Sequence, residues 1–239
     1  MRLAVISDIH GNRTAFEAVL EDLRETSPDL ILHGGDLAQG GSSPAEVLDH
    51  IRELGWQGVM GNVDEMFTNP ETYRAFTSRS PHLQTLWMAI DEMAESAREA
   101  LGDERIAWLR MLPRVQFTET IALMHASPGS TWDSPIQQAT DAELGATYSV
   151  LGRPIVVYGH IHVPFVRKVQ NMVVVNTGSV SLSYDGDPRA AYLLLDGTRP
   201  TIRRVEYNIE QELGLLAGSG IPHADWIASS LKAARPQMP

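Results

Sequence analysis

The chain has 239 residues, 43% of them hydrophobic and 21% charged, which is typical of a globular protein and predicts one domain over residues 1–239. Its formal net charge of −11 argues against long nucleic acid as a partner, because binding to a phosphate backbone needs clustered Lys and Arg. The absence of cysteine excludes disulfides and thiolate ligands, so any metal ion must be held by His, Asp, Asn and similar groups.

The first predicted strand, over residues 3–6, runs directly into Ser7-Asp8-Ile9-His10. In an extended segment residues i and i+2 point the same way, so Asp8 and His10 project together from the carboxyl end of the strand, where open α/β sheets place ligands. A carboxylate and an imidazole directed at one point suit a transition metal better than magnesium or calcium. Taken alone, however, such a pair is more often a helix-capping aspartate and an ordinary surface histidine.

Two further strand ends carry residues of the same kind. Asp36 follows a strand predicted over residues 29–33, and Asn62 follows a short strand around residues 58–60. Apolar residues at helical spacing predict crossover helices over 14–25 and 44–54. The alternation of strand and helix places these strand ends at one edge of a parallel sheet.

Strand signals stop between residues 65 and 110, where aromatic residues and methionines lie among polar ones in two or three predicted helices. We interpret this segment as a helical insertion that packs on the main domain or forms a homo-oligomer interface. The alternative is a lid over the functional site, for which Tyr73, His82 and Trp87 are the side chains to watch.

The second half of the chain predicts a hairpin ending at His125, a helix over 140–151 and a buried strand over 154–158 that ends in Gly159-His160-Ile161-His162. Four short strands separated by turn residues follow, which predicts a largely antiparallel second sheet. These strands are expected over residues 165–169, 172–176, 191–195 and 201–206, and a helical tail over residues 208–239.

The N-terminal residues enter the first strand with no charged and then apolar leader. No apolar stretch approaches the roughly eighteen residues that a membrane span requires. We therefore expect a cytoplasmic protein that acts on a small substrate and has no membrane partner.

Seven residues of metal-ligand type thus stand at or just after predicted strand ends, and their gathering at one edge by accident is improbable. These residues are Asp8, His10, Asp36, Asn62, His125, His160 and His162. In the order Asp-x-His, Gly-Asp, Gly-Asn, His and Gly-His-x-His, the sequence resembles the calcineurin-like metallophosphoesterases. The segments 176–180 and 185–190 are similar to those of the small bacterial and archaeal branch of that superfamily.

The resemblance implies an α/β fold, a four-layer α/β/β/α sandwich of two mixed sheets, with residues 65–110 inserted as helices. It also implies two divalent transition-metal ions. One would be held by Asp8, His10 and His162, the second by Asn62, His125 and His160, with Asp36 bridging both. Manganese is favoured, although iron, zinc, cobalt and nickel accept the same ligands.

The family's chemistry is in-line attack of a metal-bridging hydroxide on phosphorus. The resemblance makes Asp36, Asn62 and His10 the catalytic residues of a phosphoric ester hydrolase. Asn12 and Arg13, which follow the first two ligands at a helix N-terminus, are predicted to contact the substrate phosphate.

Position 63 departs from the family pattern, because the histidine that often follows Gly-Asn is replaced by Val63. Valine cannot protonate a leaving oxygen, and a positioned general acid is typically worth about 10²–10⁴-fold. We therefore expect weak hydrolysis of simple alkyl monoesters and favour phosphodiesters. The alternatives are a phosphomonoesterase acting on a nucleotide or phosphoprotein, and a metal-binding scaffold with weak catalysis.

Four further residues are placed outside the ligand set. Asp64 is expected to be a structural hydrogen-bonding group, and His33 to pack near the site rather than to replace the missing acid. His50 and His223 belong to no motif and are expected at the surface.

Overall fold

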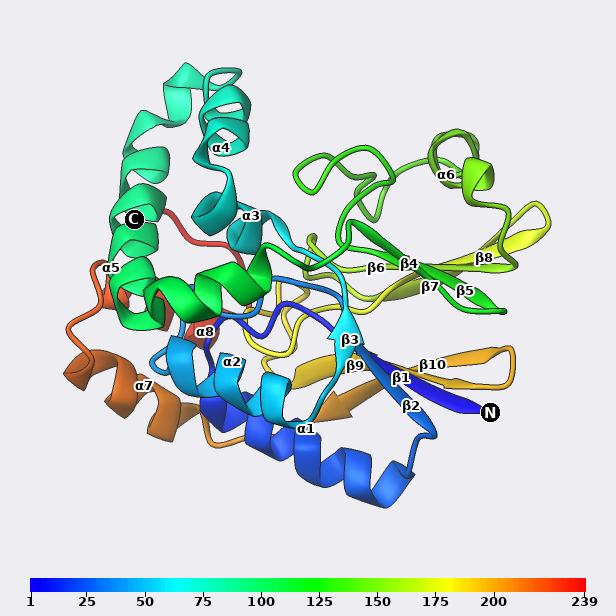
Figure 1. The fold of residues 1–239 in the computed structure, drawn as a ribbon, viewed down its shortest axis with the longest axis horizontal. Coiled ribbons are helices and arrows are strands. Elements are labelled where there is room, and N and C mark those ends of the chain that lie inside the picture. The colour runs from blue at the N-terminus through cyan, green and yellow to red at the C-terminus, as the bar shows by residue number, and fades with distance from the viewer.

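The computed structural model describes all 239 residues and contains two five-stranded sheets with helices outside them (Figure 1). In strand order, the first sheet is β10-β9-β1-β2-β3 and the second is β4-β5-β6-β8-β7. The strands are β1 Arg2–Ile6, β2 Leu30–His33, β3 Gln57–Gly58, β4 Val115–Phe117, β5 Ile121–Met124, β6 Ile155–Tyr158, β7 Phe165–Val169, β8 Met172–Asn176, β9 Ala190–Asp196 and β10 Arg199–Val205.

The alternation of side chains along β1 explains the layers. Leu3 and Val5 pack into the apolar layer between the two sheets, together with residues of β5, β6 and β8. Ala4 and Ile6 pack on the opposite face, against helices. Because both faces of the strand are covered, β1 is an apolar run, as expected for a central strand. The predicted four-layer sandwich of two mixed sheets is confirmed.

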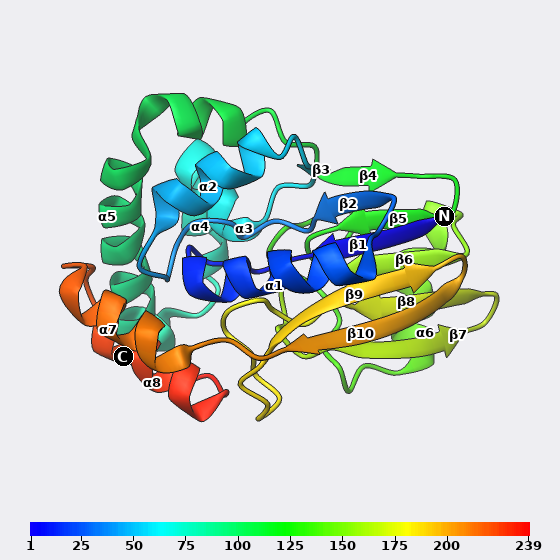
Figure 2. The same ribbon diagram turned by 90° about the horizontal axis from the view of Figure 1, so that it is seen from below.

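Helices cover the outer faces of both sheets (Figure 1), and Figure 2 shows the helix that follows β1 lying across the first sheet. The apolar faces of α1 and α2 pack on the first sheet, and α6 packs on the second. The helices are α1 Arg13–Thr26, α2 Pro44–Glu53, α3 Asn62–Thr68, α4 Pro70–Thr77, η1 Pro81–Leu83, α5 Gln84–Leu109, α6 Asp141–Tyr148, η2 Ser149–Leu151, α7 Ile209–Gly218 and α8 Ala224–Ala233. None of them combines the length and apolar character needed to cross a membrane.

The prediction that the four strands of residues 165–206 form a largely antiparallel second sheet is wrong, because they are divided between the two sheets. Strands β7 and β8 join the second sheet, where β6 runs parallel to both β5 and β8, whereas β9 pairs antiparallel with β1 in the first sheet. The physical reason is burial on both faces of β9. Leu193 faces the layer between the sheets and Tyr192 faces the helices, so β9 occupies an interior position.

The helical segment after β3 packs on the main domain. Met66 and Phe67 of α3 and Ala97 and Leu101 of α5 join the same apolar cluster as Phe16 of α1. Helix α5 bends at Gly102, whose φ of 67° breaks the helical conformation. Whether part of this segment also forms a homo-oligomer interface stays a prediction.

The C-terminal helices α7 and α8 lie beside α5 and close the helical end of the molecule (Figure 1). Glu212 of α7 is fully buried, and its carboxylate accepts hydrogen bonds from the Thr14 hydroxyl at 2.8 Å and the Ser42 amide at 3.0 Å. One side chain thus joins α7 to α1 and to the loop before α2.

We expect Glu212→Ala to lower the free energy of unfolding by about 2–4 kcal/mol, because two buried donors lose their acceptor. Urea denaturation measures the change. Glu210→Ala, an exposed position of the same helix, is the matched control and should stay within about 0.5 kcal/mol of the unsubstituted protein. Equal stability of the two variants would contradict a structural role for the α7 attachment.

Candidate metal centre

The fold brings all seven predicted ligand residues together at the carboxyl ends of strands from both sheets. Strand β1 runs from the N-terminus toward α3, α5 and α8 (Figure 1). Asp8 and His10 follow β1, Asp36 follows β2, and Asn62 begins α3 just after β3. His125 follows β5, and His160 and His162 follow β6. All but His160 are buried.

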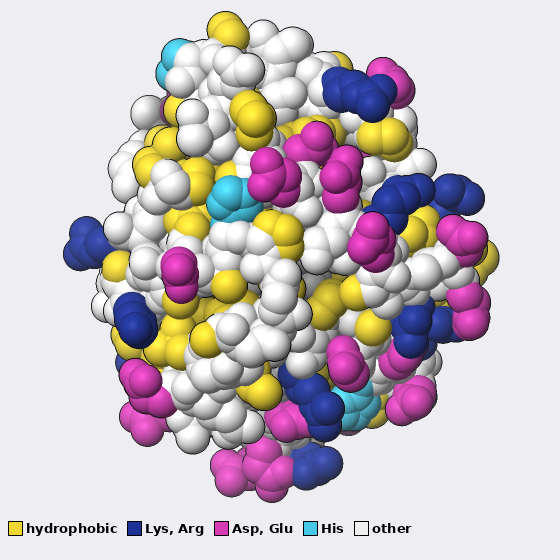
Figure 3. Space-filling model, turned by 90° about the vertical axis from the view of Figure 1, so that its left-hand side faces the viewer, with side chains coloured by type: hydrophobic (Ala, Val, Ile, Leu, Met, Phe, Trp, Pro, Cys, Tyr) yellow, Lys and Arg dark blue, Asp and Glu magenta, His cyan; other side chains and the backbone are white.

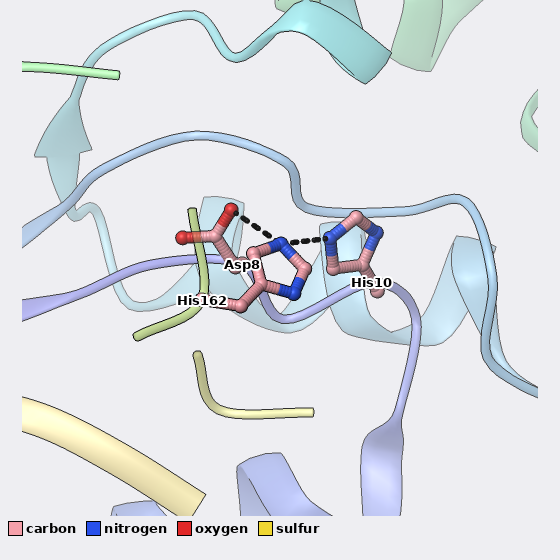
Figure 4. Close-up of side chains that lie close together, drawn as sticks. All are labelled: Asp8, His10 and His162. Atoms are coloured by element: carbon pink, nitrogen blue, oxygen red, sulfur yellow. Dashed lines mark hydrogen bonds and ion pairs between the residues drawn. The ribbon is translucent and has the colours of Figure 1, made fainter. Parts of the chain in front are cut away.

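Asp8, His10 and His162 form one group (Figure 4). His162 Nε2 lies 3.1 Å from Asp8 Oδ1 and 3.2 Å from His10 Nε2. Asp8 is further held by the Ser7 hydroxyl, which donates to its Oδ2 at 2.5 Å, and by the His160 amide. Three ligand-type atoms therefore converge on one small volume.

Asn62, His125 and His160 form a second group. Asn62 Oδ1 lies 2.8 Å from His125 Nε2 and 2.9 Å from His160 Nδ1. The amide carbonyl and the two imidazole nitrogens are neutral donor atoms of the kinds that a transition metal accepts. This group contains no carboxylate of its own.

Asp36 lies between the two groups. Its Oδ2 is 3.7 Å from His10 Nε2 and 3.5 Å from His125 Nε2. Its Oδ1 instead accepts the backbone N–H of Val63 at 2.9 Å. One oxygen is therefore occupied within the protein, and the other faces both groups.

The histidine tautomers suit metal binding. The Nδ1–H groups of His10, His125 and His162 donate to the carbonyls of Gln39, Gly34 and Leu182 at 2.7, 2.8 and 2.6 Å. When such a ring is neutral, its Nε2 is unprotonated and directed at the centre, as in ligating histidines whose other nitrogen is hydrogen-bonded. The residues present therefore fit a metal ion at each group.

Five of the seven proposed ligand residues have a left-handed backbone conformation. Nine non-glycine residues have positive φ, and five of them are Asp8, His10, Asp36, His160 and His162, at 51–67°. The left-handed region costs an ordinary residue roughly 1–2 kcal/mol, and such strain concentrates at functional sites. The surrounding loops hold this strain, since the amides of Asp8 and His10 donate to Gly35 and Asp36.

Asp64 has the structural role expected from the sequence. Its buried carboxylate accepts the amides of Asp36 at 2.9 Å, Leu37 at 3.1 Å and Gly61 at 2.9 Å. It thereby joins the loop after β2 to the start of α3. A Cβ on Gly61 would lie 2.1 Å from Asp36 Oδ1, so only glycine permits this approach.

Buried charge dominates the electrostatics of the centre. Burial opposes a charged His125, but the neighbouring Asp36 carboxylate raises the pKa of His125 to about 10. Burial and the charge on His125 lower the pKa of His160 to about 4. Burial and the nearby charge of Asp36 raise the pKa of Asp64 to about 6. The protein thus balances buried carboxylates with a proton on His125, which a bound cation would displace.

The contact of Asn12 with the substrate phosphate stays a prediction, and within the protein this side chain has another role. Asn12 is fully buried; its Oδ1 caps α1 through the Ala15 amide, and its side-chain amide donates to Ser181. Helix capping and ligand binding use the same residue types, and capping explains this one. Arg13 lies on the surface in an ion pair with Glu17, and its contact with substrate stays a prediction.

The other histidines lie outside the ligand set. His33 is fully buried with neither ring nitrogen hydrogen-bonded, 6.0 Å from the Trp108 ring, and burial lowers the pKa of His33 to about 3. This is the packing role expected for it. His82 is exposed on η1, and His223 pairs with Glu92.

Sequence reasoning missed several residues that support the site. Ser179 donates to the backbone carbonyl of Asp8 at 2.8 Å, and the Tyr184 ring stacks on that of His162 at 4.6 Å. Trp226 of α8 lies in a pocket that includes His10 and Asn62. No motif or spacing marks these residues, because their role depends on how the C-terminal helices pack.

Comparison with known proteins places the chain in a family. Residues 1–199 match the calcineurin-like phosphoesterase superfamily domain, which ends before α7 and α8. The crystal structure of a metallophosphoesterase from Sphaerobacter thermophilus aligns with a TM-score of 0.78 and 25% identity, over 98% of this chain and 100% of that one.

Two relatives found by sequence differ in how much of each chain the alignment covers. An uncharacterized protein of Methanocaldococcus jannaschii is 26% identical over 252 residues, which cover 96% of each chain. A symmetrical bis(5'-nucleosyl)-tetraphosphatase of Cronobacter sakazakii is 28% identical over 160 residues, which are 65% of this chain and 53% of that enzyme. The match thus spans about half the length of that tetraphosphatase.

We expect Asp64→Ala to lower the free energy of unfolding by about 3 kcal/mol or more, because three buried amides lose their acceptor. The same change should weaken manganese binding, since the backbone that carries Asp36 loosens. Urea denaturation and metal titration measure the two effects. Asp91→Ala, an exposed position of α5, is the control; a similar effect in both variants would contradict the structural role of Asp64.

Proposed function

Because the chain belongs to the calcineurin-like phosphoesterase superfamily and is therefore a phosphoric ester hydrolase, we propose that it is a dinuclear metal-dependent phosphoesterase that prefers phosphodiesters. The position of Asp36 is the observation that carries the proposal. One oxygen of this buried carboxylate faces His10 and His125, which belong to different groups of ligand atoms. A bridging carboxylate is what a two-metal site requires.

The proposed ligands follow from the two groups. Asp8, His10 and His162 would hold one ion, Asn62, His125 and His160 would hold the other, and Asp36 would be shared between them. When bound, two divalent ions supply a water-derived nucleophile at neutral pH and balance charge on the phosphoryl oxygens. Manganese is our first choice of metal, and the mixed oxygen and nitrogen ligands support it, as they also support iron or zinc.

The protein's own residues orient the reaction. The Nδ1–H donations of three histidines to backbone carbonyls fix the direction of each Nε2 lone pair. The Val63 amide fixes Asp36 by holding its Oδ1. Asn62 contributes a neutral carbonyl rather than a carboxylate, which leaves the second group more attractive to an anionic phosphate. Burial of six of the seven side chains limits access of bulk water.

The preference for diesters rests on position 63. The Val63 side chain lines the pocket that also contains His10 and Asn62, so the place where relatives often carry a histidine offers no proton. A leaving group that departs without protonation is therefore favoured. A phosphomonoesterase is the second candidate, and a weakly catalytic metal-binding scaffold is the third, although the intact set of seven ligand side chains argues against a scaffold.

A small substrate fits the charge distribution. On the face that carries the helices at the left of Figure 1, Lys and Arg are scattered, and most of them lie beside acidic side chains (Figure 3). Arg79 pairs with Asp133 and Arg114 pairs with Glu65 in the pocket that these residues share. These ion pairs leave little net positive charge for a long nucleic acid or a polyphosphate chain. They favour a simple ester over the dinucleoside tetraphosphates named for some relatives.

We expect chelation to abolish hydrolysis of bis-p-nitrophenyl phosphate and added manganese to restore it. Asp36→Ala and His160→Ala should each lower activity by roughly 100-fold or more and reduce bound metal, because each removes a ligand. His82→Ala removes an exposed histidine and should leave both unchanged. Undiminished hydrolysis in both ligand variants, measured with metal analysis, would contradict the proposed ligand roles.

We expect the unsubstituted protein to hydrolyse bis-p-nitrophenyl phosphate faster than p-nitrophenyl phosphate. Val63→His should raise release of phosphate from a simple alkyl monoester by about tenfold or more, because it supplies a proton donor beside Asn62. Val63→Ala tests whether added space alone has this effect. A strong preference of the unsubstituted protein for the monoester would reject the assignment to phosphodiesters.

A further inference from the structure

An apolar pocket opens directly beside the candidate metal centre. It has a volume of about 130 Å³, and fourteen residues line it, nine of them hydrophobic. His10 and Asn62, one from each group of ligand atoms, belong to its wall. A group attached to a phosphate at the metal centre would therefore enter this pocket.

The walls of the pocket come from segments far apart in the chain. Met93 of α5 and Trp226 and Ile227 of α8 form the side away from the sheets, while Trp132 and Tyr184 come from loops. The Tyr184 ring stacks on that of His162, which connects this wall to the ligand cluster. The pocket is thus continuous with the proposed active site.

Helix α8 is a fixed part of this wall. The ring of His223, just before α8, lies 2.9 Å from the Glu92 carboxylate of α5. Ile227 and Leu231 are buried against Met93 and Leu216. Helix α8 also lies beyond residues 1–199, the part of the chain that matches the family domain.

The size and chemistry of the pocket indicate what it holds. An apolar protein cavity of roughly 150 Å³ is large enough to bind benzene. No Lys, Arg, Asp or Glu lines this pocket, so a second phosphate or a carboxylate would find no charged partner there. Aromatic and methionine side chains instead favour a flat apolar ring.

We propose that this pocket, lined by Trp132, Tyr184 and Trp226, binds one aromatic ring of the substrate, so that the enzyme acts on phosphate esters that carry a single-ring aryl group. The inference rests on the proposed phosphoesterase function, because the phosphate of the ester must lie at the metal centre. Burial of the ring provides affinity, and the limited volume discriminates against larger fused rings.

Binding of non-hydrolysable phosphonates to the manganese-loaded full chain tests the inference by isothermal titration calorimetry. Phenylphosphonate should bind about 10- to 100-fold more tightly than methylphosphonate, because only its ring enters the pocket. Naphthylphosphonate should lose most of this advantage. Trp226→Ala should reduce the preference for phenylphosphonate by about tenfold and leave the affinity for methylphosphonate unchanged.

A second variant guards against misfolding of the first. Ser230 lies in the same wall and is buried, so Ser230→Leu fills the pocket and should also remove the preference for phenylphosphonate. Leu215→Ala, an exposed position of α7, is the control and should keep it.

Equal affinity of the unsubstituted protein for both phosphonates, or a preference that survives both pocket variants, would overturn the inference while leaving the metal centre intact. Failure of both phosphonates to bind would contradict the proposed function and this inference with it.

Discussion

The need to compensate buried negative charge governs the structure around the candidate metal centre. Asp8, Asp36 and Asp64 are all inaccessible to solvent or nearly so, and a buried carboxylate is costly unless hydrogen bonds or cations surround it. Asp64 is satisfied by three backbone amides, whereas Asp36 has one amide on Oδ1 and only histidines near Oδ2. A cluster that burial alone would destabilise would become favourable with bound cations. The same requirement explains why the loops accept five residues in the left-handed conformation.

The sequence predicts which residues gather at this site because the proposed ligands follow local patterns. A short apolar run such as residues 3–6 and the helical spacing after Thr14 are both local signals, and each ligand stands where a strand stops. The partner of β9 is not local, since the same strand could pair in either sheet until burial on both faces is known. Asn12 shows a different limit, because an asparagine at a helix start can serve as a cap or as a ligand with no difference in sequence.

The absence of a proton donor at position 63 and the apolar pocket both suit a substrate with an aryl leaving group. Val63 contributes to the same wall as Trp226, so the substitution that removes the acid also extends the apolar surface. A phenol has a pKa near 10, as tyrosine does, whereas water and simple alcohols are far weaker acids. An aryloxide therefore leaves without the protonation that an alkoxide needs. A site that binds an aryl group has less use for a general acid.

The C-terminal helices α7 and α8 contribute both to the stability of the fold and to the pocket that would select the substrate. Glu212 fixes α7 to α1 and to the loop before α2, and the His223–Glu92 pair fixes α8 to α5. The first of these contacts lies in the core of the domain, whereas the second positions Trp226 beside the metal centre. Because α5 packs on the α3 residues that follow Asn62, any shift of α5 would reach both the pocket and a proposed ligand. The pocket wall that would select the ester group therefore depends on the same helix packing as the candidate metal centre. A substitution between α8 and α5 should change the pocket alone if α5 stays in place. It should change the pocket and the metal centre together if α5 moves.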